Sequence, residues 1–186
     1  MPTKEQREAL EDALTSTLAR AIDFIKFAET KNAALLTFAS AWLVALSNLL
    51  VGDRALDRGP RTALIIALLL LAVAAIIALR SFLPKLALST LHRDPDRSKN
   101  LLYFGDIAKF EPSAYARRIR ERYAADPEQT VSDDYLDDLA VQVAANSRIA
   151  LRKFKTFDVG VSFVIAALSI MTATAGYMAF GHIWSK

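Results

Sequence analysis

Three uncharged apolar runs constrain the fold of this chain more than any other feature of its sequence. They cover residues 33–51, 62–79 and 159–181, and none contains Asp, Glu, Lys, Arg or His. A helix that crosses the hydrocarbon core of a bilayer needs about 20 largely apolar residues. The alternative, a buried core helix, is disfavoured because a chain of 186 residues leaves too little protein to bury three such runs. The sequence therefore predicts an all-α membrane protein with three transmembrane helices.

The composition of the chain disfavours most catalytic chemistry. There is no cysteine, which excludes a disulfide framework and a thiolate metal site. The two histidines, His92 and His182, lie far apart in the sequence and give poor support for a metal or acid–base centre. We find no serine–histidine–aspartate arrangement, nucleotide-binding glycine loop or paired-carboxylate cleft. We therefore expect no catalytic residues, no metal, no cofactor and no enzyme activity.

The placement of the basic residues predicts the orientation in the membrane. Of the 23 Lys and Arg residues, 14 fall within residues 80–158. Basic residues close to a span mark its cytosolic side. Those that flank the runs on this side are Lys26, Lys31, Arg80, Lys85, Arg93, Arg97, Arg148, Arg152, Lys153 and Lys155. We therefore expect a membrane protein with a cytosolic N-terminus, and the polar residues 1–32 predict no cleavable signal peptide.

This orientation divides the chain into alternating cytosolic, spanning and external segments. We expect external residues at 52–61, between the first and second spans, and at 182–186, after the third. The predicted cytosolic segments are 1–32 and 80–158. Gly52 and the Gly59-Pro60 pair predict the external turn.

Both cytosolic segments are predicted to be helical and continuous with spans. Apolar residues recur every three or four positions between 4 and 31, namely Leu10, Leu14, Leu18, Ala21, Ile22, Ile25 and Ala28. No Pro or Gly interrupts residues 3–51 or 128–159, so each segment should run unbroken into its span. In the second segment Leu136, Leu139, Val143, Ile149, Ala150 and Phe154 share one face. We expect long helical extensions of the spans to form a cytosolic helical bundle.

The middle of the chain carries the signals of turns and shorter helices. We expect Pro84 to kink the end of the second span and residues 92–100 to form a loop. Pro112 opens a short helix that Asp126-Pro127 ends. The next helix is capped by Thr130 with Asp133, or by Ser132 alone.

An apolar cluster, Leu101 to Phe104, stands in the polar stretch NLLYFGDIAKF at residues 100–110. One interpretation is that these side chains plug the base of the helical bundle, with Asn100 and Gly105 serving the turns. The other is that Asn100, Tyr103 and Phe104 also form one wall of a ligand pocket. The sequence leaves both interpretations open.

Three stretches together resemble the Pycsar effector transmembrane family of bacterial anti-phage proteins. They are AETKN at 28–32, NLLYFGDIA at 100–108 and DLAVQVAANSRIALRKF at 138–154. The resemblance implies that a partner pyrimidine cyclase makes cyclic UMP or cyclic CMP after infection. It implies that the effector senses this nucleotide and impairs the inner membrane, so that growth stops. The sequence shows no β-rich cyclic-nucleotide domain, so a ligand site would have to be built from helices.

A cyclic pyrimidine nucleotide needs cations for its phosphate, polar groups for its base edge and an aromatic ring for stacking. Candidate cations are Arg148, Arg152 and Lys155 on one helical face, with Lys31 and Asn32 at a similar depth on the first helix. Glu29 would accept from the base or ribose, and Asn100, Tyr103 and Phe104 would complete the ligand-binding set. Arg152 is the first choice for the phosphate. The alternative role of these basic residues is lipid anchoring or structural ion pairing.

Other features bear on partners and on rival functions. The lack of charge within the spans disfavours an ion or proton carrier. Small residues at four-residue spacing favour close helix packing, either within one chain or between chains. We expect a homo-oligomer in the lipid bilayer. The arginine-rich 116–123 segment reads as a solvated helix face, so no nucleic acid polymer is expected as a partner. The rival functions are a scaffolding membrane protein and a holin-like pore-former that needs no ligand.

Overall fold

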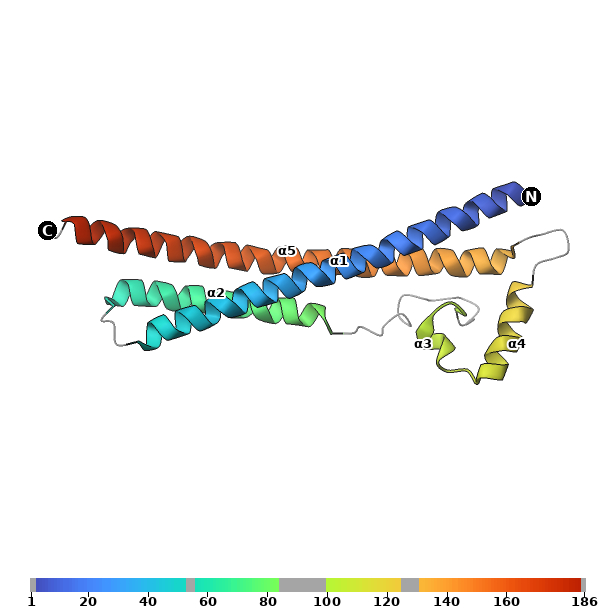
Figure 1. The fold of residues 1–186 in the computed structure, drawn as a ribbon, viewed down its shortest axis with the longest axis horizontal. Coiled ribbons are helices and arrows are strands. Elements are labelled where there is room, and N and C mark those ends of the chain that lie inside the picture. The colour runs from blue at the N-terminus through green and yellow to red at the C-terminus, as the bar shows by residue number, and fades with distance from the viewer. Residues whose placement is uncertain (1–2, 53–55, 84–99, 125–130, 185–186) are drawn as a thin grey trace. The chain divides into compact units, whose positions relative to one another are not determined.

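A computed structural model of the chain describes residues 3–52, 56–83, 100–124 and 131–184, which form helices and no strand (Figure 1). The helices are α1 (Lys4–Val51), α2 (Arg58–Ser81), α3 (Phe104–Ile107), α4 (Pro112–Tyr123) and α5 (Asp133–Trp184). Three of them, α1, α2 and α5, are long and apolar enough to cross a bilayer. The prediction of an all-α membrane protein is confirmed.

The two longest helices extend well beyond the length that a bilayer requires. With 48 residues in α1 and 52 in α5, a rise of 1.5 Å per residue gives lengths of about 70 and 80 Å. The hydrocarbon core of a bilayer is only about 30 Å thick. The expected continuity of each span with a long helical extension is therefore confirmed, and it follows from the absence of Pro and Gly at residues 3–51 and 128–159.

The second span differs from its prediction at its first turn. Helix α2 begins at Arg58, so Gly59 and Pro60 lie inside the helix rather than in a turn before it. Proline is tolerated there because the first backbone N–H groups of a helix have no intrahelical acceptor. At the other end α2 stops at Ser81. The predicted kink at Pro84, the loop at 92–99, the stop at Asp126-Pro127 and the Thr130 cap lie outside the described residues.

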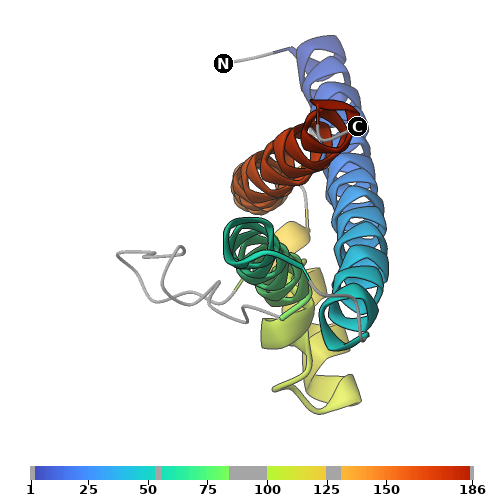
Figure 2. The same cartoon turned by 90° about the vertical axis from the view of Figure 1, so that its left-hand side faces the viewer.

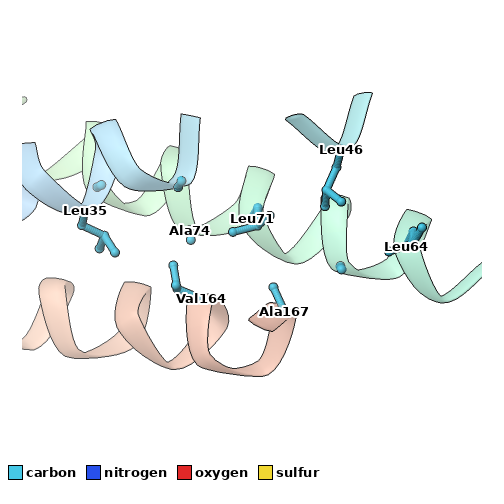
Figure 3. Close-up of a cluster of buried hydrophobic side chains, with 10 residues drawn as sticks. Leu35, Leu46, Leu64, Leu71, Ala74, Val164 and Ala167 are labelled. Atoms are coloured by element: carbon cyan, nitrogen blue, oxygen red, sulfur yellow. The ribbon is translucent and has the colours of Figure 1, made fainter. Parts of the chain in front are cut away.

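The chain divides into two compact units, and α1 and α5 contribute to both. Unit 1 comprises Met1–Lys26 with Pro84–Leu151, and unit 2 comprises Phe27–Leu83 with Arg152–Lys186. Unit 2 holds the apolar parts of α1, α2 and α5, which lie side by side (Figures 1 and 2). Its buried core is made of Leu and Ala with one Val, as Figure 3 shows, and consists of Leu35, Ala39, Leu46, Leu64, Ala67, Leu71, Ala74, Ala78, Val164 and Ala167.

The buried residues of the long helices repeat with the seven-residue period of a coiled coil. In α2 they alternate at spacings of four and three and are Pro60, Leu64, Ala67, Leu71, Ala74, Ala78 and Ser81. In α1 they fall on the same pattern and are Arg7, Ala21, Ala28, Asn32, Leu35, Ala39 and Leu46. In α5 a line of seven-residue steps passes through Leu139, Asn146, Lys153, Gly160, Ala167 and Thr174, all buried or partly buried. Each helix therefore buries one narrow seam.

The seam corrects the predicted apolar face of the first segment. Leu10 and Ile22 were expected on the buried face of α1, but their exposed fractions are 48% and 38%. They lie beside the seven-residue seam, whereas Leu14, Leu18 and Ile25 lie on it and are partly buried. Apolar residues spaced three or four apart therefore cover a wider face of α1 than the face that the helix buries.

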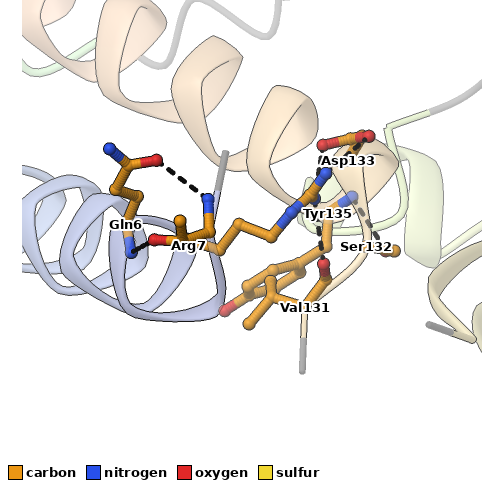
Figure 4. A network of polar contacts seen from close by, with 7 residues as sticks. Gln6, Arg7, Val131, Ser132, Asp133 and Tyr135 are labelled. Carbon is orange, nitrogen blue, oxygen red and sulfur yellow. Dashed lines mark hydrogen bonds and ion pairs between the residues drawn. The ribbon is translucent and has the colours of Figure 1, made fainter. Parts of the chain in front are cut away.

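Unit 1 joins the beginning of α1 to the beginning of α5 through a buried arginine (Figure 4). The guanidinium of Arg7, which is 5% exposed, donates to Asp133 Oδ1 at 2.6 Å and Oδ2 at 3.3 Å, and to the carbonyl of Val131 at 3.3 Å. This hydrogen bond lowers the pKa of the Asp133 carboxyl below its ordinary value. Ser132 Oγ accepts from the Tyr135 N–H at 3.3 Å, which confirms Ser132 as a cap of α5.

Candidate functional site

A polar layer crosses the seam of unit 2 next to its apolar core. We define this polar layer as Glu29 and Asn32 of α1, Ser81 of α2 and Lys153 of α5. The Lys153 ammonium donates to the Ser81 carbonyl oxygen at 2.8 Å and lies 3.0 Å from Glu29 Oε1. The Lys153 side chain is 16% exposed and the Glu29 side chain 45% exposed. One lysine therefore connects all three long helices.

Asn32 occupies the centre of the polar layer and is fully buried. Its Nδ2 donates to the Ala28 carbonyl at 2.8 Å and to the Lys153 carbonyl at 3.3 Å. Within the described residues, neither its Oδ1 nor the buried Oγ of Ser81 has a hydrogen-bond partner. The amide of Asn32 thus contacts α5 directly, while two polar atoms of the layer remain unsatisfied by the described chain.

The ammonium of Lys31, the residue before Asn32 in α1, lies among three aromatic rings. It is 4.8 Å from the ring centroid of Phe27, 5.3 Å from that of Phe157 and 5.8 Å from that of Phe154. Such distances are those of cation–π contacts. The rings of Phe27 and Phe154 are 6.1 Å apart, so α1 and α5 share this cluster. The predicted ligand residue Lys31 is therefore occupied by contacts within the chain.

Two of the predicted cations of α5 in this unit point outward. Arg152 and Lys155 are both exposed, and their side chains make no hydrogen bond or ion pair with the described part of the chain. Lys153 stands between them in sequence but on the buried side of α5. The face that carries the exposed cations is thus distinct from the face that carries the polar layer. The third predicted cation, Arg148, is also exposed and belongs to unit 1.

The segment from Asn100 to Phe104 belongs to unit 1 and serves two different purposes. Asn100 is 1% exposed, its Nδ2 donates to the Asp138 carbonyl at 3.0 Å, and its Oδ1 accepts from the Leu102 N–H at 2.8 Å. Leu101 is 1% exposed and belongs to the core, whereas Phe104 is 65% exposed, so the core interpretation of the two is wrong for Phe104. The rings of Tyr103 and Phe104 meet edge to face at 4.8 Å. These two rings remain candidates for stacking on a base.

Residues 104–107 form a short helix, α3, where only a turn was expected. Gly105 lies inside this helix, and no turn conformation requires it there. A Cβ atom at Gly105 would approach the Tyr103 ring to 2.6 Å at Cε1. The absence of a side chain therefore lets the Tyr103 ring lie against the backbone of α3.

Asp138 is a buried carboxylate that connects α4 to α5 in unit 1. It is 3% exposed, and it accepts from the Tyr123 hydroxyl at 2.5 Å and from Arg122 at 3.2 Å. Burial and the hydrogen bond to this carboxylate raise the pKa of the Tyr123 hydroxyl above its ordinary value. Asp138 is therefore an internal partner of α4.

The sequence prediction therefore found part of the polar layer and missed the rest. Glu29 and Asn32 were named, but Lys153 and Ser81 were not. The missing signal was the seven-residue seam, since steps of seven lead from Ala167 and Gly160 back to Lys153, and from Ala74 to Ser81. Asp138 and Arg122 carried no comparable signal, because their pairing depends on how α4 packs against α5.

Comparisons with known proteins give two matches that cover most of the chain. The sequence pattern of the Pycsar effector protein domain matches residues 13–180. The chain is also similar to the Pycsar effector protein RsPycTM of a Rhizobium species, with 42% identity over 158 residues, which cover 85% of this chain and 90% of that protein. No solved structure matches the chain. On the extent of both matches, the chain belongs to the Pycsar effector protein family and is an anti-phage defence effector.

Proposed function

We propose that this effector senses a cyclic pyrimidine nucleotide, cyclic UMP or cyclic CMP, and then impairs the bacterial inner membrane so that growth stops. A partner cyclase supplies the nucleotide, and the cytosolic parts of α1 and α5 receive it. The effector acts as a homo-oligomer in the bilayer, with its N-terminus in the cytosol, and it catalyses no reaction. Membership of the Pycsar effector family supports this proposal.

The observation that carries the proposal is the pair of exposed cations that flank Lys153 in the sequence. Arg152 and Lys155 stand one turn apart on α5 with no partner among the described residues, just before the third apolar run. A nucleotide phosphate that binds there would contact the turn of α5 that also carries Lys153, whose ammonium lies 3.0 Å from Glu29 Oε1. Helix α5 continues from these residues into the membrane. A bound anion is therefore placed to change how the spans pack, provided that it binds the two states with different affinity.

The proposal predicts that Arg152→Ala weakens nucleotide binding. Loss of one charge-assisted contact costs about 1.5–3 kcal/mol, which corresponds to roughly a 10- to 150-fold higher Kd. The measurement is titration of the purified protein with cyclic UMP and cyclic CMP, together with cyclase-dependent growth arrest in cells.

Arg118→Ala is the matched control because the Arg118 side chain is 56% exposed on α4 and pairs only at 3.6 Å with Glu121. Both variants should insert into the membrane, and only Arg152→Ala should lose affinity and arrest. An equal loss in both would indicate a general charge effect. Full affinity in Arg152→Ala would move the phosphate site away from α5 and favour the Asn100–Phe104 segment.

A further inference from the structure

The polar layer lies at the end of the apolar core of unit 2, where the seam changes from Leu, Ala and Val to polar residues. The neighbouring core residues of all three helices are Leu, Ala or Val. Each helix contributes one buried or largely buried polar residue at the same level: Asn32 from α1, Ser81 from α2 and Lys153 from α5. A single polar residue at a core position of a coiled coil fixes the register of the helices at a cost in stability. The polar residues of this layer are therefore expected to fix the register of α1, α2 and α5.

The polar layer is also only partly satisfied. Asn32 Oδ1 and Ser81 Oγ are buried and accept or donate no hydrogen bond within the described residues. A buried polar atom without a partner destabilises the fold, and replacing buried polar groups by apolar groups of similar shape is often stabilising. The layer therefore selects one packing of the helices without making that packing as stable as an apolar layer would.

Lys153 binds the C-terminal end of α2. It donates to the carbonyl of Ser81, the last residue of α2, where carbonyl groups have no intrahelical donor. A positive charge is also favourable at the C-terminal end of a helix dipole. Its other partner, Glu29, is 45% exposed. Lys153 is the cationic member of the layer, so it is the member that an added anion would attract in competition with Glu29.

We propose that the polar layer is a register lock that holds α1, α2 and α5 in the resting packing and opens when the effector is activated. Asn32 and Ser81 set the register, and Lys153 is the contact that breaks. This inference rests on the proposed function for its trigger, but the lock itself is a property of the resting protein. It predicts opposite consequences for two kinds of substitution in the same layer.

The first substitution, Asn32→Leu, preserves the branched shape of the side chain and makes the layer apolar. The resting protein should unfold at a temperature about 3–10 °C higher in detergent, as expected when a buried unsatisfied group is removed from a chain of this size. Cyclase-dependent growth arrest should be lost because the resting packing no longer opens. Asn48→Leu, on the exposed face of α1, is the matched control and should leave both readouts unchanged.

The second substitution, Lys153→Met, removes the ammonium and keeps most of the apolar stem. It should lower the unfolding temperature and cause growth arrest on expression without the cyclase. Lys109→Met, whose lysine is 59% exposed and pairs locally with Asp106, is its control and should cause neither change.

The lock would be overturned if Asn32→Leu were no more stable than the wild type and still responded fully, or if Lys153→Met were silent without the cyclase. If Asn32→Leu fails to accumulate, Ser81→Ala is the deciding variant, because it removes one unpartnered hydroxyl and adds no atoms. An unfolding temperature of Ser81→Ala at or below the wild-type value would overturn the lock. A wild-type protein that ignores both nucleotides would defeat the proposed function alone, since the stability shifts and cyclase-independent arrest need no nucleotide.

Discussion

Leu101 and Phe104 are three residues apart, and their side chains lie in opposite surroundings. Leu101 is 1% exposed and Phe104 65% exposed. Leu101→Ala should therefore destabilise the protein by about 2–5 kcal/mol, the usual cost of a buried leucine. Phe104→Ala should change stability by no more than about 0.5 kcal/mol, as at other surface sites. Denaturant unfolding of the purified variants measures both values.

The nucleotide affinity of Phe104→Ala shows whether the exposed Phe104 ring contacts the ligand. If Phe104 stacks on the base, the variant should accumulate normally and lose nucleotide affinity. A variant with normal abundance, stability and affinity would remove Phe104 from the ligand-binding set.

The Tyr123–Asp138 hydrogen bond predicts how stability depends on pH. Tyr123 has an ordinary pKa of 10.0, and burial and the adjacent carboxylate raise the pKa in the folded protein. The hydroxyl's contribution to stability is therefore fully present below pH 10 and is lost progressively above it, because the unfolded chain releases the proton first. Unfolding measured from pH 8 to 11 should show this loss in the wild type. Tyr123→Phe should be less stable at pH 8 and show a shallower decline above pH 10.

Asn32 and Glu29 were predicted as ligand residues because they precede a span on a predicted helix. The structure shows that both belong to the polar layer, and their contact with a ligand stays a prediction. Lys153 was overlooked in favour of its exposed neighbours, since charge alone does not distinguish the buried side of α5 from the exposed side. The Asn100 contact to Asp138 spans 38 positions in the sequence and depends on tertiary packing.

At the scale of elements, α1 and α5 were predictable because neither contains Pro, and because Gly is absent from α1 and from α5 before Gly160. The start of α2 was placed too late because Gly59-Pro60 also suits a first helical turn. Helix α3 was missed because it comprises only four residues and contains a glycine. The long helices therefore follow from local sequence, whereas the short one depends on its surroundings.

The continuity of α1 should matter for signalling as well as for folding. Ala34→Pro would break α1 just beyond the polar layer, where Ala34 is exposed and proline costs about 3 kcal/mol or more in a helix interior. The variant should insert and bind nucleotide but fail to stop growth. Ala34→Ser is the control. Full arrest in Ala34→Pro would mean that a rigid α1 does not carry the signal.

At the scale of the whole molecule, the three spans and their basic flanks predict a single topology. Reporter fusions placed after Leu56 and after Lys186 should report the external side, and a fusion after Asp126 should report the cytosol. The physical reason is the excess of Lys and Arg in residues 80–158. If both termini lay on the same side of the membrane, the three-span arrangement would be wrong.

The proposed function requires that a cyclic pyrimidine nucleotide makes this protein impair a membrane. The measurement is dye release from vesicles that contain the purified protein, with cyclic UMP or cyclic CMP added on the side of the vesicle membrane where Arg152 lies. We predict release with at least one of the two cyclic nucleotides, none with linear UMP or CMP, and none from vesicles carrying Asn32→Leu. Vesicles that leak equally without nucleotide, or that stay sealed at nucleotide concentrations that saturate binding, would contradict the claim.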